Sequence, residues 1–265
     1  MKKSIFNLII ILFSLVILVF ITAPIIKLFT FSNFEMIAKT AVEKEVLQSI
    51  FLTLKASFVA TVITLIFGIP LAYVLARYNF KGKVFVESII NIPVIIPHTA
   101  AGIALLTVFG DNFFMGKLAN KFGMSFTGEF AGIVVAMMFV SMPFLINESK
   151  EGFKKIDVKY EKVARTLGAT QTKAFFKVVL PMNKNHILSG SLMMWARGIS
   201  EYGAVLVLAY HPMVAPTLIY ERFSSYGLKY SIPVSVVMII ITLIIFSVFK
   251  VIQRGEENYD KNWKD

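Results

Sequence analysis

Residues 148–181 read ESKEGFKKIDVKYEKVARTLGATQTKAFFKVVLP and form the longest polar stretch of an otherwise apolar chain. Over 158–167 the apolar residues recur near helical spacing with charges between them, and Gly168 follows as the predicted C-cap. A second short helix is expected at about 172–179, ended by Pro181. The stretch therefore predicts two short amphipathic helices joined by a glycine turn. A solvated pair of surface helices would have the same composition, so the spacing of single residues has to decide its role.

The composition around this stretch is that of a membrane protein. Of the 265 residues 57% are hydrophobic and 16% charged, and the mean hydropathy is +0.73. A soluble domain is about half apolar and about a quarter charged. The absence of cysteine excludes disulfides and thiolate chemistry, and the three histidines are too far apart in sequence to suggest a metal site.

Six segments have the length and apolarity of membrane spans. A hydrocarbon core about 30 Å thick needs roughly 20 apolar residues as helix. The expected spans are about 4–26, 50–76, 88–109, 130–147, 186–209 and 232–252. The first follows only Met1, Lys2 and Lys3, which also fits a signal peptide. Its apolar run is long and no cleavage pattern follows, so we expect it to be retained.

The distribution of Lys and Arg orients these spans. With the N-terminus inside, 18 lie on the cytoplasmic side and 8 on the outer side, so both termini are expected in the cytoplasm. The net charge of +11 is explained by this bias, and no nucleic-acid partner is expected. We predict an all-α integral membrane protein, multi-pass in the lipid bilayer of the cell membrane, with a single transmembrane domain over 1–265 and a cytoplasmic loop over 148–185.

Spacing within the loop gives a first resemblance. Ala164, Gly168 and the Leu180-Pro181 pair match the cytoplasmic signature of importer-type ABC permeases, which is Glu-Ala-Ala, three residues, Gly, nine residues, Ile-x-Leu-Pro. In that family the loop forms a coupling helix that sits in a cleft of the ATPase subunit. The resemblance implies these ATPase-coupling residues: Glu161, Lys162, Val163, Ala164, Arg165, Gly168 and Pro181.

This chain departs from the signature at its front edge. Lys162 stands where the glutamate would fall, Val163 replaces the first alanine, and Glu161 comes one residue early. Val178 replaces the isoleucine. The contacts that Lys162 and Val163 would make with an ATPase are therefore left open.

Further segments resemble the permeases of molybdate, tungstate and sulfate importers. The run 195–204, WARGISEYGA, is similar to their Ala-Arg-x-x-x-Glu-Phe-Gly-Ala stretch, and 91–102, NIPVIIPHTAAG, to the opening of their third span. With 68–73, GIPLAY, the similarity covers 50–225 and favours the archaeal molybdate/tungstate type. It implies a homodimeric six-span permease, two copies of an ATP-binding ABC ATPase subunit, an extracellular oxyanion-binding protein, alternating access and no cofactor. A sulfate/thiosulfate permease is the alternative within the class.

Two ionisable residues fall inside the fifth expected span. Arg197 and Glu201 are four residues apart, on one helical face, and a charge at bilayer centre costs about 2.5–3.5 kcal/mol. An oxyanion would be attracted by Arg197 but repelled by Glu201, which favours a structural or gating pair over a pathway site. The pathway or gate candidates are Pro93, Pro97, His98, Thr99, Arg197, Ser200 and Glu201.

Sequence patterns of other functions are missing. The run Gly110 to Lys117 has five residues between its glycines and Leu118 after the lysine, so it fails the phosphate-loop pattern. The chain is therefore predicted not to be an enzyme, with ATP hydrolysed by a separate subunit. A secondary transporter would need more intramembrane acids or an internal repeat, and a membrane scaffold would not need the two loop helices.

Overall fold

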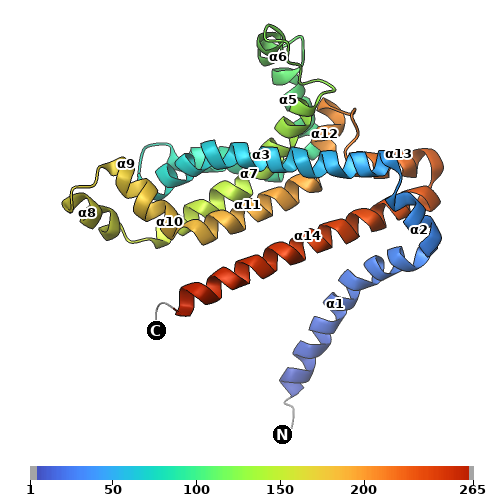
Figure 1. Ribbon diagram of the computed structural model, residues 1–265, viewed down its shortest axis with the longest axis horizontal. Coiled ribbons are helices and arrows are strands. Elements are labelled where there is room, and N and C mark those ends of the chain that lie inside the picture. Colours follow the sequence, from blue (N-terminus) through green and yellow to red (C-terminus); the bar gives the residue numbers. More distant parts are fainter. Residues whose placement is uncertain (1–4, 263–265) are drawn as a thin grey trace. The chain divides into compact units, whose positions relative to one another are not determined.

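The structure is a computed structural model that describes residues 5–262. Within that range the chain is helical and contains no β-strand (Figure 1). The helices are α1 (Ile5–Phe31), α2 (Phe34–Ala41), α3 (Lys44–Arg77), α4 (Lys83–Ile95), α5 (His98–Phe109), α6 (Phe114–Asn120), α7 (Phe130–Lys155), α8 (Lys159–Thr166), α9 (Gln171–Ala174), the π-helix η1 (Phe175–Val179), α10 (Leu180–Met182), α11 (Lys184–Ile199), α12 (Gly203–Leu208), α13 (Ala215–Tyr226) and α14 (Leu228–Asn262). The predicted all-α class is confirmed. Residue 4, where the first expected span begins, lies outside the described residues.

Among the described residues, four helices are long and apolar enough to cross a membrane. They are α1 from Phe6, α3, α7 and α14 as far as Phe249. A fifth crossing arises if α4 and α5, which meet at a bend of 115°, form one broken span. Four or five of the six expected crossings are thus present as helices with the length and apolarity of a membrane span.

Two expected spans are interrupted rather than continuous. At 88–109 the helix breaks at Ile96 and Pro97, because a residue before proline is pushed to extended backbone and Ile96 has ψ 149°. At 186–209 the helix breaks at residues 200–202, between α11 and α12. There the Glu201 carboxylate accepts the backbone N–H of Ala204 at 2.9 Å, which caps a new helix start. The chain therefore begins a new helix, α12, instead of continuing α11.

The loop expected at 148–185 also differs from its prediction at both ends. α7 continues to Lys155, eight residues beyond the expected 147, because its last turns stay packed: Phe153 is fully buried. Pro181 does not end the second loop helix, which runs on to Met182. The π-helical turn η1 precedes the proline, and in it the Leu180 N–H bonds to the Phe175 carbonyl five residues back. Pro181 lies in the first turn of α10, where its missing backbone N–H leaves no hydrogen bond of the helix unmade.

The chain packs as two compact units. The first joins residues 5–50 to 218–262, and in it α14 packs against α2 and α1. Arg222 donates to Glu43 at 2.6 Å and to Glu45 at 2.9 Å. Burial acts to lower the pKa of Arg222, but hydrogen bonds to Glu45 and Glu43 outweigh it and raise the pKa above its ordinary value. The apolar side chains of α1 from Phe6 to Phe20 are all exposed, which suits lipid or another chain.

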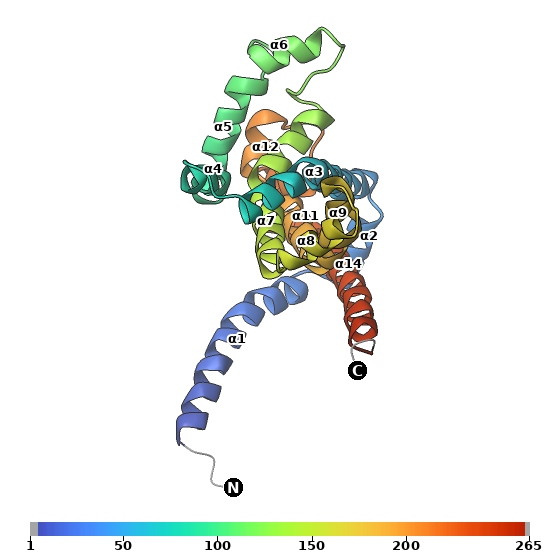
Figure 2. The same cartoon turned by 90° about the vertical axis from the view of Figure 1, so that its left-hand side faces the viewer.

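The second unit, residues 51–217, is built around α7 and α11, which pack along one another. α3 lies beside α11, where the Ser57 hydroxyl donates to the Trp195 carbonyl at 2.7 Å and the indole donates to the Leu54 carbonyl at 3.2 Å. In Figure 1 these three helices run lengthwise, with α8 and α9 at one end, and Figure 2 views the unit from that end. The helices α3, α7 and α11 therefore connect the loop helices with the region of α5 and α12.

Candidate functional site

The helix α8 has well-defined ends. Asp157 accepts the Lys159 N–H at 2.9 Å at its start. At its end Gly168 has φ +88°, and the N–H groups of Gly168 and Ala169 bond back to Arg165 and Ala164, each at 3.0 Å. This is the αL C-cap predicted for Gly168. Local sequence therefore fixes where α8 stops.

Glu161 is turned into the molecule and ties α8 to the end of α3. Its carboxylate accepts Arg77 Nε at 2.6 Å and the Tyr73 hydroxyl at 2.7 Å. The Arg77 and Glu161 side chains are only 8% and 16% exposed. Arg77 also donates to the Ile156 carbonyl at 3.0 Å, and Tyr73 packs edge-on to Phe153. We call this group, Tyr73, Arg77 and Glu161, the α8 tether.

The rest of α8 faces outward. Val163 is 57% exposed and Leu167 83% exposed, beside the exposed cations Lys162 and Arg165. Ala164 is partly buried between the two faces. Of the residues expected to couple to an ATPase, Glu161 is thus turned away from the free surface, and the others on α8 are available to a partner.

Pro181 lies apart from α8, exposed on α10. Two residues further on, Asn183 is fully buried and donates to the Ser149 carbonyl of α7 at 2.9 Å. A Cβ on Gly152 would lie 1.9 Å from Asn183 Oδ1, so only glycine allows this approach. The Leu180-Pro181 end of the signature therefore sits at a tight joint between the loop and the spanning helices.

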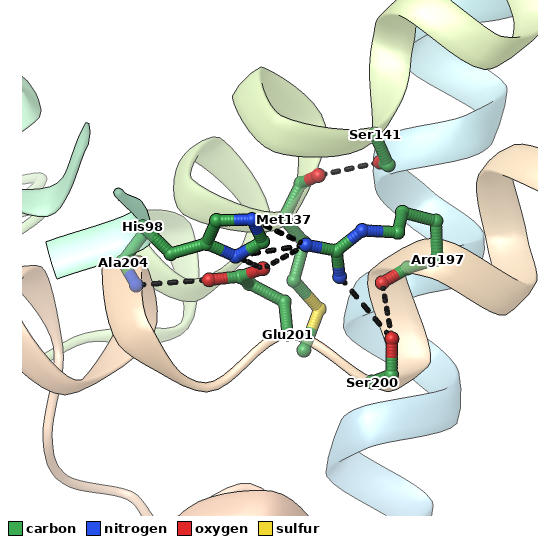
Figure 3. A network of polar contacts seen from close by, with 7 residues as sticks. All are labelled: His98, Met137, Ser141, Arg197, Ser200, Glu201 and Ala204. Atoms are coloured by element: carbon green, nitrogen blue, oxygen red, sulfur yellow. Dashed lines mark hydrogen bonds and ion pairs between the residues drawn. The ribbon is translucent and has the colours of Figure 1, made fainter. Parts of the chain in front are cut away.

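A second polar group lies where the two helix breaks meet (Figure 3). Glu201, which is fully buried, accepts His98 Nδ1 at 2.7 Å and pairs with Arg197 at 3.0 Å. Its other oxygen caps α12. Arg197 also donates to the Ser200 hydroxyl at 3.2 Å. We call His98, Arg197, Ser200 and Glu201 the break network, and it contains the Arg197–Glu201 pair that the sequence predicted.

The guanidinium of Arg197 lies against the ring of His98. One guanidinium nitrogen of Arg197 lies 2.8 Å from both Nδ1 and Nε2 of His98. An in-plane atom that close to both would overlap Cε1, so the guanidinium lies over the ring face. The Nδ1–H is then free to donate to Glu201. Within the break network Arg197 is already paired with Glu201 at 3.0 Å, so its charge is engaged before an oxyanion could reach it.

Glycines bring the two broken helices together. A Cβ on Gly203 of α12 would lie 2.8 Å from His98 Cβ and 3.1 Å from Thr99 N. On the facing helix, a Cβ on Gly102 would lie 2.7 Å from Val207 Cβ. Because both helices lack a side chain at the crossing, α5 and α12 approach closely enough for His98 to reach Glu201.

The remaining gate candidates surround this network without joining it. Pro93 is buried inside α4, where it does not break the helix. Pro97 and Thr99 are exposed at the bend on either side of His98. Exposed backbone at such a bend is tolerated where it meets protein or water rather than lipid.

Sequence reasoning missed three residues of these sites. Tyr73 reads as an ordinary aromatic of an apolar span, and Arg77 as a charge that marks the cytoplasmic end of a helix. Asn183 is one polar residue in a polar loop. Each gains its role from a partner 34 to 88 residues away, and a separation of that size leaves no local pattern.

The sequence is similar to those of several known proteins. The curated "Molybdate/tungstate transport system permease protein WtpB" of Pyrococcus abyssi is 42% identical over 235 residues, 88% of this chain and 90% of the relative. The protein of the same name in Methanocaldococcus jannaschii is 44% identical over 80% of this chain and 84% of the relative. A "Probable sulfate transport system permease protein cysT" of Chlorokybus atmophyticus is 31% identical over 90% of this chain and 86% of the relative.

Among solved structures, a bacterial alginate ABC transporter in complex with its alginate-bound periplasmic protein has a similar fold. It superposes with a TM-score of 0.72 at 17% identity, covering 95% of this chain and 93% of that chain. The fold is therefore that of a membrane-embedded importer permease. Residues 68–255 match the family described as "Binding-protein-dependent transport system inner membrane component", and the chain belongs to this family. It is a multi-pass protein of the cell membrane.

Proposed function

We propose that the chain is the permease subunit of an ATP-driven importer that moves molybdate and tungstate into the cytoplasm. The observation that carries the proposal is α8, a compact helix with Val163 exposed on it and Leu167 exposed at its C-cap, which the α8 tether fixes to the spanning helix α3. Force applied to α8 by a partner would reach the membrane through Arg77. The relatives named for molybdate and tungstate are more similar to this chain than the one named for sulfate.

In this proposal the working unit is a homodimer of two six-span chains with both termini in the cytoplasm. Two ATPase subunits bind the two α8 helices, and an extracellular binding protein delivers the oxyanion. Closure of the ATPases on ATP would shift the pathway between inward- and outward-facing states. The Lys and Arg bias of 18 to 8 supports the orientation, and the exposed apolar length of α1 supports contact with lipid or with the second chain.

The break network is proposed to hold the gate region rather than to bind substrate. Its two charges cancel, and Glu201 would repel a dianion at close range. It joins the bend between α4 and α5 to the break between α11 and α12, two places where a helix can hinge. Pro97 and Thr99 at the exposed bend are the candidates for lining the pathway.

The test is uptake by the reconstituted complex. Permease, ATPase and binding protein are placed in vesicles, and labelled tungstate uptake is measured with ATP while molybdate or sulfate competes. We expect molybdate to compete strongly and sulfate weakly. Sulfate competing best would replace the substrate and favour the sulfate/thiosulfate alternative. Uptake that continues without the ATPase would instead favour a secondary transporter and overturn the proposal.

A further inference from the structure

The surface around α8 is cationic because its acids are already engaged. Residues 157–177 contain five Lys or Arg and two acids, Asp157 and Glu161. Glu161 forms an ion pair with Arg77 within the α8 tether, and Asp157 Oδ2 lies 3.6 Å from Lys159 Nζ. A sequence count therefore underestimates the positive charge that this surface presents to a partner.

Two of the cations line a defined hollow. Lys162 and Arg165, one turn apart on α8, border an open hollow of about 540 Å³ whose other wall is the turn 168–171. Neither side chain has an ion-pair partner among residues 5–262. Gly168 has open space beside it, so the turn does not fill the hollow. Val163 on the same short helix and Leu167 at its C-cap are exposed beside them.

We propose that the ATPase subunit presents carboxylate side chains to this hollow. Its docking cleft would have an apolar floor for Val163 and Leu167 and one or more Asp or Glu at the rim against Lys162 and Arg165. This inference rests on the proposed function and adds the chemistry of the contact. The departure of Lys162 from the family's glutamate is then a change in the sign of the docking charge, which the ATPase of this transporter must match.

A protein cleft fits this surface better than an anionic membrane does. The exposed apolar side chains on α8 and its flanks are Val158, Tyr160, Val163 and Leu167. Because they occupy only two helical turns, they offer a small area for insertion at a lipid surface, where binding scales with buried apolar area. A short, rigidly held helix with a small hollow beside it suits insertion into a preformed cleft. Carboxylates fit because Lys162 and Arg165 are exposed at the hollow, and opposite charge across an interface raises the rate and specificity of association.

The experiment measures binding of the purified ATPase subunit to the full-length permease in nanodiscs of uncharged lipid. Dissociation constants are taken by interferometry from about 0.05 to 0.5 M salt, a range over which screening strengthens several-fold. The variants are Lys162→Glu with Arg165→Glu, and the milder Lys162→Gln with Arg165→Gln in case the reversal perturbs folding. The matched control is Lys117→Glu with Lys121→Glu, two exposed cations of the segment 110–129.

We expect affinity of the unaltered permease to fall steeply with salt. The reversal should weaken binding about 10- to 100-fold at low salt and flatten the salt dependence, with the neutral variant between and the control near the unaltered value. Equal affinity and equal salt dependence in all variants would overturn this inference alone. Failure of the ATPase to bind the unaltered permease would overturn the proposed function. If these cations instead govern binding to vesicles of anionic lipid and leave ATPase binding unchanged, the partner is the membrane.

Discussion

The α8 tether makes a sharp prediction for Glu161→Gln. The substitution keeps the size of the side chain and a carbonyl oxygen for the Tyr73 hydroxyl, but removes the charge that faces Arg77 at 2.6 Å. Arg77 then keeps its hydrogen bond to the Ile156 carbonyl and loses its only ion pair within residues 5–262.

The magnitude follows from the burial of the pair. With the two side chains 8% and 16% exposed, solvent cannot replace the lost interaction fully. A hydrogen bond between charged groups contributes about 1.5–3 kcal/mol. The equilibrium between attached and detached α8 should therefore shift by about ten- to a hundredfold, since 1.4 kcal/mol is a factor of ten.

Detachment should be visible as unfolding of α8. A helix of eight residues is not stable by itself in water, where about 12–15 residues are needed. Amide hydrogen exchange over 159–169 should therefore accelerate by the same factor in detergent or nanodiscs without any partner. In the full transporter, ATP hydrolysis should continue while uptake per ATP falls.

The control is Glu129→Gln, the same chemical change at an exposed carboxylate with no partner among residues 5–262. It should leave exchange over 159–169 unchanged. If Glu161→Gln exchanges no faster than the control, the tether does not hold α8 and the proposed route of force through Arg77 fails.

Three other outcomes are expected. Glu201→Gln leaves Arg197 as an unpaired charge and should destabilise the protein by about 3–5 kcal/mol, which is measured as a lower melting temperature. The double variant Glu201→Gln with Arg197→Gln should largely restore the melting temperature. If it does not, Arg197 and Glu201 do not act as a charge pair. Gly203→Ala places a Cβ 2.8 Å from His98 Cβ and should lower the free energy of unfolding by about 1–3 kcal/mol through overpacking. An unchanged melting temperature would mean that α5 and α12 separate freely. Arg222→Gln leaves two carboxylates without their shared cation and should loosen residues 215–230 in hydrogen exchange, whereas no change there would make the pairs dispensable.

The sequence by itself determined the elements whose cause is local. Apolar runs of roughly 20 residues specify membrane helices because a bilayer demands that length. Gly168 ends α8 because glycine adopts the αL backbone at little cost, and the structure has it at φ +88°. The spacing of Ala164, Gly168 and Leu180-Pro181 indicated the family, to which the chain belongs. The pairing of Arg197 with Glu201 followed from the cost of burying either charge alone.

Only the tertiary structure decided which way individual side chains face and where helices stop for reasons outside the local sequence. Glu161 was expected to contact the ATPase, and only the structure shows that its carboxylate pairs with Arg77, 84 residues away. Two expected spans are broken. For the span at 88–109, Pro97 is a local signal for the break. The span at 186–209 breaks where the buried Glu201 carboxylate accepts the Ala204 N–H and also binds His98, 103 residues away. Partners at such separations are set by packing of the whole chain, which the periodicity of a single segment does not encode.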